Sequence, residues 1–166
     1  MELWDAYNKD FKKVGVDLVR GEKIPEGYFH LVVGIVVKHI DGSYLILTRD
    51  SIKEPWPGYE EIGPGGSAIK GENAKHAALR ELEEETGIKV NDLIEISTSI
   101  QEQYQSIAVC FLCLFDGNKD SIRLQAGETT SYRWVDKEEL IKFINSDKCI
   151  PTQKLRLTNF INSKYF

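Results

Sequence analysis

The residues best suited to chemistry are the carboxylates of the run Arg80-Glu81-Leu82-Glu83-Glu84-Glu85. If the run is helical, Glu81, Glu84 and Glu85 share roughly 100° of one face, and Glu83 points toward solvent. Like charges at this spacing repel one another, but a divalent cation reverses the sign of that interaction. Mg²⁺ prefers oxygen ligands and is commonly held by a few carboxylates together with substrate phosphates. The pattern predicts a Mg²⁺ site facing a diphosphate, and the alternative is a solvated acidic face.

The segments around the carboxylates favour the metal site. Residues 72 to 86 are rich in alanine and glutamate, which predicts a helix, and Gly87 supplies its stop signal. The preceding Gly63-Pro64-Gly65-Gly66 lets the backbone approach a ligand or offer a carbonyl oxygen to a metal. This glycine run does not match the phosphate-binding pattern G-x-x-x-x-G-K-[ST].

The bulk composition narrows the class of protein. The chain has 166 residues, 42% hydrophobic and 28% charged, which fits one globular domain over 1–166 with 1–27 as a peripheral extension. A net charge of −5 argues against electrostatic binding to a nucleic-acid backbone. The start of the chain lacks the pattern of a secretory signal, and no apolar run approaches the roughly 20 residues of a membrane helix. We expect a cytoplasmic protein with a small-molecule partner, no nucleic-acid polymer and no membrane.

The three cysteines are too few for a disulfide framework. Cys110 and Cys113 have C-x-x-C spacing but lie in an apolar run that predicts a buried strand, where positions three apart point to opposite faces. We interpret them as inert core thiols rather than a redox or zinc pair.

The elements that must position the carboxylates are short and mixed. Residues 2–20 predict a peripheral hairpin, and 30–40 and 43–48 predict a second hairpin around Asp41-Gly42. Residues 50–66 hold too many prolines and glycines for regular structure, apart from a short extended piece at Glu61-Ile62. Further strands are expected at 92–100, 104–115 and 132–135, and helices at 137–145 and 152–162. This mixture predicts a layered α/β domain.

Nine positions resemble the Nudix box, G-x5-E-x7-R-E-U-x-E-E-x-G-U, in which U is an aliphatic residue. They are Gly66, Glu72, Arg80, Glu81, Leu82, Glu84, Glu85, Gly87 and Ile88. The signal is specific because its spacings must hold across 23 residues. Trp56-Pro57-Gly58 and Arg133-Trp134-Val135 also resemble Nudix features. The resemblance implies the Nudix fold, a mixed β-sheet sandwiched between helices (α/β/α), here with a small N-terminal β-hairpin.

The resemblance also implies a reaction and a metal set. A Nudix hydrolase of this kind would cleave a diphosphate linkage in a nucleoside diphosphate joined to another moiety, such as a nucleoside triphosphate, ADP-ribose or a nucleotide sugar. Glu81, Glu84 and Glu85 would bind Mg²⁺, or Mn²⁺ in its place, with a backbone carbonyl of Gly65 or Gly66 assisting.

The other box residues would shape this site. By resemblance, Arg80 would orient the glutamates and Glu72 would fix the preceding loop on the helix. Gly87 would end the helix, and Leu82 and Ile88 would pack inward.

Water would attack a phosphorus atom of the diphosphate, with a carboxylate activating the water. The candidate bases are Glu81, Glu84, Glu102 and Glu128, because family members draw this base from the box or from a later loop.

Residues before the box are candidates for substrate binding. Arg49 and Lys53 lie where a cation could face the metal site, although ordinary surface charges would look the same. Trp56 and Tyr59 could stack on a base or pack the loop.

Two other functions compete with hydrolysis. The N-terminal extension resembles the subgroup that includes isopentenyl-diphosphate isomerases, but residues 59–66 lack the cysteine that those isomerases use. A non-catalytic module that senses a nucleotide is the other alternative, and the complete set of box carboxylates argues against it. The N-terminal hairpin could also serve a homodimer.

Overall fold

The computed structural model describes residues 1–166, arranged as nine strands, three α-helices and two short 3₁₀ turns. In chain order these are β1 (Leu3–Tyr7), β2 (Lys13–Val19), β3 (His30–His39), β4 (Tyr44–Arg49), β5 (Glu60–Ile62), β6 (Gly65–Ser67), α1 (Ala74–Thr86), β7 (Ile94–Gln101), η1 (Glu102–Tyr104), β8 (Ser106–Phe115), η2 (Lys119–Ser121), β9 (Thr129–Val135), α2 (Lys137–Ile144) and α3 (Pro151–Ile161). Both predicted hairpins and the later strands and helices are confirmed to within a few residues.

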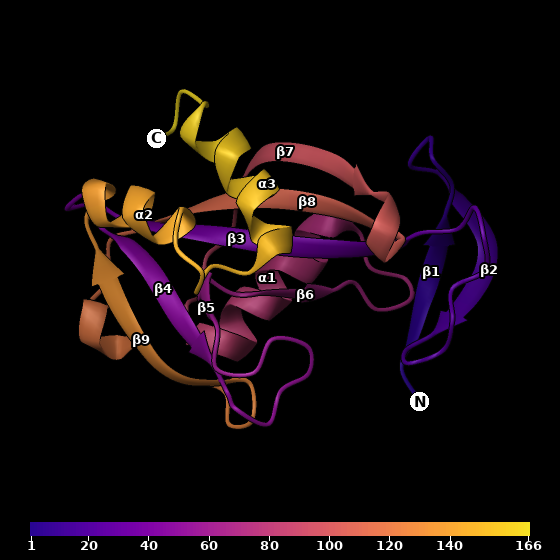
Figure 1. Ribbon diagram of the computed structural model, residues 1–166, viewed down its shortest axis with the longest axis horizontal. Helices are drawn as coiled ribbons and strands as arrows, with labels where there is room; N and C mark the ends of the chain where they lie inside the picture. The colour runs from indigo at the N-terminus through magenta and orange to yellow at the C-terminus, as the bar shows by residue number, and fades with distance from the viewer.

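Helices cover both faces of the main sheet, as the predicted α/β/α arrangement requires (Figure 1). Alternate residues of β3 divide between two cores, because side chains on a strand alternate between faces. Val33 and Ile35 pack with Leu82 of α1, whereas Val36 packs with Leu157 of α3. Cys110 and Cys113 are likewise buried in different cores, which confirms that they point to opposite faces.

The sheet is mixed, and its order is β5-β4-β3-β8-β7, with β6 pairing β3 and β9 pairing β4. β3 and β8 run parallel in continuous register, from His30 opposite Ser106 to His39 opposite Phe115. β3 and β4, by contrast, are paired only near their turn, at Lys38 and Tyr44.

Residues 60–67 fill the space where β3 and β4 diverge, with β5 on β4 and β6 on β3. The loop predicted over 50–66 therefore contains two short strands, and its prolines and glycines hid the second of them. Gly63 allows the crossing between them because it adopts a φ of 65°, and a Cβ there would overlap the carbonyl group of Ile35.

The predicted carboxylate helix begins later than its composition indicated. Asn73 caps α1 by accepting a hydrogen bond of 2.9 Å from the backbone N–H of His76, so the first helical residue is Ala74. Glu72 lies in the preceding loop. Gly87 ends the helix at a φ of 74° and donates its N–H to the carbonyl of Glu83 at 2.8 Å, as its position predicted.

The N-terminal hairpin of β1 and β2 stands at one end of the molecule and has a small core of its own around Trp4 and Leu18 (Figure 1). It contacts the loop that leads into α1, because Lys70 N–H donates to the Leu3 carbonyl at 2.8 Å and Gly71 N–H donates to the Asp5 carboxylate at 2.9 Å. None of the three helices has the length and apolar composition needed to cross a membrane.

Candidate functional site

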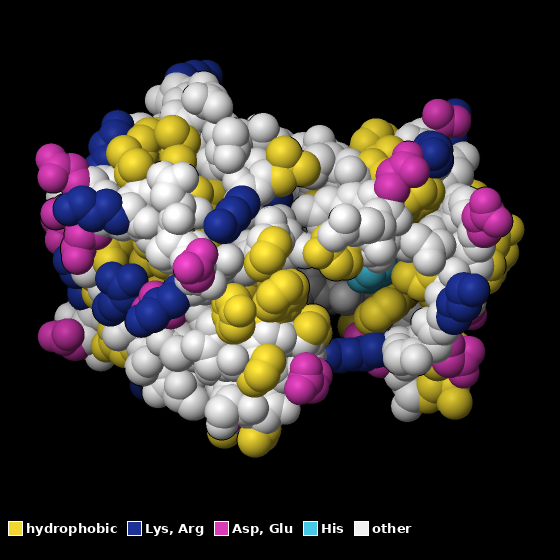
Figure 2. Space-filling view, viewed as in Figure 1, with side chains coloured by type: hydrophobic (Ala, Val, Ile, Leu, Met, Phe, Trp, Pro, Cys, Tyr) yellow, Lys and Arg dark blue, Asp and Glu magenta, His cyan; other side chains and the backbone are white.

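A cavity of about 520 Å³ lies where the sheet divides, with a lining drawn from β3, β5, β6, α1, α3 and the loop after β4. Figure 2 shows the surface hollowed between the N-terminal hairpin and the rest of the molecule. Glu2 and Arg20 of that hairpin also belong to the lining.

The carboxylate face of α1 borders the cavity, because Ala77 and Leu82 are fully buried and fix the rotation of the helix. Glu81, Glu84 and Glu85 all belong to the lining. The structure therefore brings together the three carboxylates that the helical arc predicted.

The remaining glutamate of the run, Glu83, lies outside the cavity. Glu83 is exposed and forms an ion pair of 2.7 Å with Lys89. Its place agrees with the prediction that this side chain points toward solvent.

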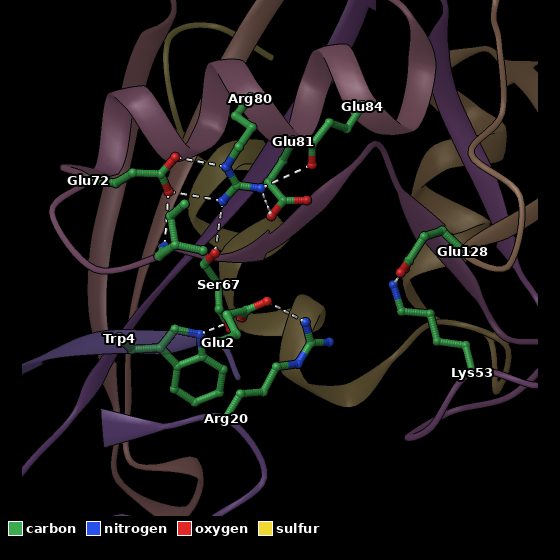
Figure 3. A network of polar contacts seen from close by, with 11 residues as sticks. Glu2, Trp4, Arg20, Lys53, Ser67, Glu72, Arg80, Glu81, Glu84 and Glu128 are labelled. Carbon is green, nitrogen blue, oxygen red and sulfur yellow. Dashed lines mark hydrogen bonds and ion pairs between the residues drawn. The ribbon is translucent and has the colours of Figure 1, made fainter. Parts of the chain in front are cut away.

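Arg80 connects α1 with the segment that precedes it through a network of hydrogen bonds (Figure 3). Its Nε and Nη2 donate to the two carboxylate oxygens of Glu72 at 2.8 and 2.9 Å. Its Nη1 donates to Glu81 at 2.8 Å and to Glu84 at 3.1 Å, and its Nη2 donates to the Ser67 carbonyl at 3.1 Å. One guanidinium thus connects the loop, the strand β6 and two of the helix carboxylates, because its planar fork can serve several acceptors at once.

Glu72 fastens the loop to the helix from the other side. Besides the two bonds from Arg80, it accepts a hydrogen bond of 3.0 Å from the Ile69 N–H. Partial burial opposes ionisation of Glu72, but these donors outweigh it and lower the pKa of the carboxyl group. Glu72 and Arg80 therefore hold the backbone before α1 against the helix.

Buried carboxylates behind the network favour a cation. Glu85 is only 3% exposed, and its Oε2 has no hydrogen-bond partner. Burial, followed by the charges of Glu61 and Glu81, raises the pKa of Glu85 to about 8. Burial likewise raises the pKa of Glu61 and of Glu81. An unpartnered buried oxygen among several carboxylates fits a hard divalent cation, which would supply the missing partner and offset the repulsion.

The two glycines of β6 leave room where the carboxylates need it. A Cβ on Gly66 would lie 2.6 Å from Cδ of Glu81, so only a glycine lets that carboxylate rest against the backbone of β6. A Cβ on Gly65 would lie 2.5 Å from the carbonyl oxygen of Val33, which keeps β6 close to β3. Both glycines belong to the cavity lining, as a site that uses a backbone carbonyl there requires.

The two predicted substrate cations have different surroundings. Lys53 lines the cavity and contacts Glu128 (Figure 3), while burial lowers its pKa despite the nearby charges of Glu85 and Glu61. Arg49 is buried, and its guanidinium donates to the carbonyls of Pro55 and Trp56 and to Glu61. Both residues line the cavity; Lys53 is placed to meet a ligand, whereas the guanidinium of Arg49 also holds the loop after β4.

Of the two predicted aromatic contacts, Trp56 belongs to the cavity lining. Tyr59 is outside the lining and packs edge to face against Trp56, with ring centroids 5.2 Å apart.

The two loop candidates for the base also differ in position. Glu128 lines the cavity beside Lys53. Glu102 is outside the lining, on the surface, where it forms an ion pair of 2.7 Å with Lys9.

Several polar residues of the lining were not found from the sequence. Glu61, Gln153 and Arg156 belong to it, and Gln153 donates its amide to Glu61 at 3.0 Å while accepting from the Ile62 N–H at 3.0 Å. The C-terminal helix gave no pattern that separates Gln153 or Arg156 from ordinary surface residues.

The chain resembles one family of known proteins along most of its length. Residues 28–153 match the family described as the NUDIX domain. An uncharacterised Nudix hydrolase of Listeria monocytogenes is 34% identical over 154 residues, which are 91% of this chain and 89% of that protein. The isopentenyl-diphosphate Delta-isomerase of Corynebacterium diphtheriae is 25% identical over 126 residues, which are 70% of this chain and 69% of that protein.

Solved structures of low sequence identity share the fold. The crystal structure of DR0079 from Deinococcus radiodurans has a TM-score of 0.79 at 18% identity and covers 98% of this chain and 100% of that one. The NUDIX domain of NrtR from Shewanella oneidensis, complexed with ADP ribose, has a TM-score of 0.61 at 18% identity, covering 82% of this chain and 89% of that one.

Proposed function

The chain belongs to the Nudix hydrolase family, and on this premise we propose that it is a Mg²⁺-dependent enzyme that hydrolyses a diphosphate linkage. The substrate class is a nucleoside diphosphate joined to another moiety. One observation carries the proposal: three carboxylates of α1 border one cavity, and among them Glu85 has a buried oxygen without a partner. A solvated acidic face would not bury such a group, because burying an unpaired polar atom is costly.

Glu81, Glu84 and Glu85 would hold the cation, with a backbone carbonyl of Gly65 or Gly66 assisting. Mg²⁺ is favoured by an all-oxygen set, and Mn²⁺ would fit the same ligands. When bound, the cation would neutralise charge on the phosphate oxygens during the reaction.

The remaining steps belong to the chain itself. A carboxylate accepts a proton from water while the water oxygen forms a bond to phosphorus and the bridging P–O bond breaks. Of the four candidate bases, Glu81, Glu84 and Glu128 line the cavity, and Glu102 does not. Lys53, beside Glu128, is placed to bind a phosphate oxygen. Arg80 positions Glu81 and Glu84 rather than reacting itself.

The substrate class draws support from the relatives. A structural neighbour is complexed with ADP ribose, and another, from C. elegans, is an Ap4A hydrolase. ADP-ribose and Ap4A both contain phosphoric anhydride bonds in a phosphate chain that is attached to adenosine. We further propose that residues 1–166 act as one hydrolase domain with 1–27 as its extension. The homodimer and the cytoplasmic location stay predictions.

An isomerase is the second candidate, favoured by the Corynebacterium relative. It would need a reactive cysteine before the box, and residues 59–66 contain none. Burial raises the pKa of all three thiols of the chain to about 11, which disfavours the reactive thiolate. Hydrolysis is therefore the better supported reaction.

The proposal can be tested by replacing Glu84 or Glu85 with Gln, which keeps the shape and removes the charge. Wild-type protein is assayed with Mg²⁺ on nucleoside triphosphates, ADP-ribose, dinucleotides and nucleotide sugars. We expect each variant to lose at least about 100-fold in kcat/KM on the best substrate. The matched control is Glu83→Gln, on the same helix but exposed, which should stay near wild type.

Near wild-type turnover of both variants, with Mg²⁺ bound as before, would show that the metal assignment is wrong. If the wild-type protein bound a nucleotide but released no product from any of these compounds, the non-catalytic alternative would replace the hydrolase.

A further inference from the structure

Arg156 brings a positive charge to the cavity from the opposite side of the sheet. Its side chain extends from α3 toward Gly34 of β3, and Gly34 pairs with Cys110, which packs in the core beneath α3. The carboxylates of α1 border the same cavity from the other face, so Arg156 and these carboxylates reach it from opposite sides of the sheet.

The guanidinium of Arg156 lacks the partners that a buried charge normally has. Its Nε is completely buried and has no hydrogen-bond partner. Glu61 is the acidic group that favours its charge, but the Glu61 carboxylate accepts its hydrogen bonds from Arg49 and Gln153. Arg156 as a whole is only partly buried and lines the cavity, so its guanidinium can be reached by an anionic ligand that would supply the hydrogen-bond acceptors it lacks.

The strand beneath Arg156 independently leaves space for the guanidinium. Gly34 interrupts a strand of valine and isoleucine, where a glycine often marks the close approach of another group. A Cβ at this position would overlap Nη1 of Arg156 and lie 3.3 Å from its Cζ, and the nearest atoms are all from Arg156. The φ of Gly34 is outside the left-handed region, so backbone conformation does not require glycine. Glycine at this position instead leaves the space that the Arg156 guanidinium occupies.

Resting on the proposed hydrolase function, we propose that Arg156 binds an anionic group of the substrate that is separate from the diphosphate being cleaved. A guanidinium fork matches the paired oxygens of a phosphate or a carboxylate. The diphosphate itself belongs at the α1 face, where the proposed cation ligands lie, so Arg156, on the α3 side, is left for a further charge. The enzyme should therefore prefer diphosphates that carry an additional phosphate or carboxylate.

Matched substrate pairs test this preference. Coenzyme A and dephospho-coenzyme A differ by one phosphate, and UDP-glucuronate and UDP-glucose differ by one carboxylate. We expect wild-type protein to favour the charged member of at least one pair by about tenfold in kcat/KM, as a charge-assisted hydrogen bond implies. In Arg156→Gln this ratio should fall toward one. Arg133→Gln, an arginine on the surface paired with Glu60, should keep the wild-type ratio.

Two further measurements keep the result decisive if Arg156→Gln folds poorly or no pair is cleaved. Gly34→Ala keeps the charge but displaces the guanidinium, and it should lower the same ratio. Titration of inorganic phosphate by calorimetry, in buffer with EDTA, should show about tenfold weaker binding to Arg156→Gln and to Gly34→Ala, and unchanged binding to Glu84→Gln.

The outcomes separate this proposal from the hydrolase function. Weaker phosphate binding to Arg156→Gln and to Gly34→Ala supports an anion-binding role of Arg156 even if no compound is hydrolysed. Equal phosphate binding and an unchanged substrate ratio in folded variants would overturn it and leave Arg156 as a counter-ion of Glu61. A uniform loss on charged and neutral substrates alike would also overturn it, because Arg156 would then contact the scissile diphosphate.

Discussion

Replacing Gly66 with alanine should move one proposed metal ligand without disturbing the fold. The new Cβ would lie 2.6 Å from Cδ of Glu81, whereas ordinary contacts begin at 3.4 Å, so the carboxylate must move by about 0.8 Å. Misplacing a reacting or binding group by about 1 Å can cost around 100-fold in rate. We therefore expect a loss of 10- to 100-fold in kcat/KM and a higher Mg²⁺ concentration for half-maximal activity.

The expected stability of this variant is near that of wild type. Gly66 does not have a positive φ, and the atoms that meet its Cβ belong to a side chain. The free energy of unfolding should change by less than about 1 kcal/mol, measured by urea denaturation in EDTA. Gly65→Ala is the contrast, because its Cβ would meet the Val33 carbonyl oxygen at 2.5 Å, and it should be clearly destabilised.

Gly34→Ala is the matched control for the metal measurement, since its Cβ meets Arg156 rather than Glu81. Its Mg²⁺ midpoint should equal that of wild type. A Gly66→Ala variant that keeps the wild-type kcat/KM and the wild-type Mg²⁺ midpoint would contradict this prediction. The position of the Glu81 carboxylate against β6 would then be irrelevant to the site.

Three other predictions concern the core, the loop before α1 and the thiols. Leu82→Ala removes a fully buried side chain and should lower the free energy of unfolding by about 2–5 kcal/mol, whereas Leu155→Ala, at 49% exposure, should change it by less than about 1 kcal/mol in the same urea titration. Glu72→Gln removes the charge that receives two bonds from Arg80, so kcat should fall about tenfold in steady-state assays, and an unchanged kcat would contradict its positioning role. Burial raises the pKa of the three thiols from 9.0 to about 11, so at pH 8 the folded chain should react with a thiol reagent about 100-fold more slowly than the unfolded chain, and its rate should rise with pH as thiolate forms. Rapid modification of the folded chain at pH 8 would contradict that burial.

The sequence was sufficient for elements whose signals are local. The hairpin around Asp41-Gly42 and the helix ending at Gly87 were predicted because turn and stop residues act on their immediate neighbours. The arc of Glu81, Glu84 and Glu85 followed from helical geometry alone. The start of α1 was misplaced by two residues, because Glu72 favours a helix in composition while Asn73 caps it in fact.

The rest of the site depends on contacts between distant segments. Strand β6 forms because β3 supplies its hydrogen-bond partners. Its own sequence, which contains two glycines, disfavours a strand. Arg156 enters the cavity from a position 70 residues beyond Thr86, the end of α1, so no spacing rule connects it with the box. Arg49 matched the expectation for a substrate cation by position, but the carbonyls of the following loop already occupy its guanidinium.

The hydrogen bonds between the N-terminal hairpin and the loop at Lys70 and Gly71 bear on where the chain can be cut. The segment shared with the family begins at residue 28 and stops at residue 153. A fragment trimmed to those limits would lack Leu3 and Asp5. The backbone N–H groups of Lys70 and Gly71, in the loop that carries Glu72, would then lose their hydrogen-bond acceptors. It would also take Phe160 out of the core and Arg156 out of the cavity. The smallest piece that keeps the geometry of the candidate site is therefore wider than residues 28–153.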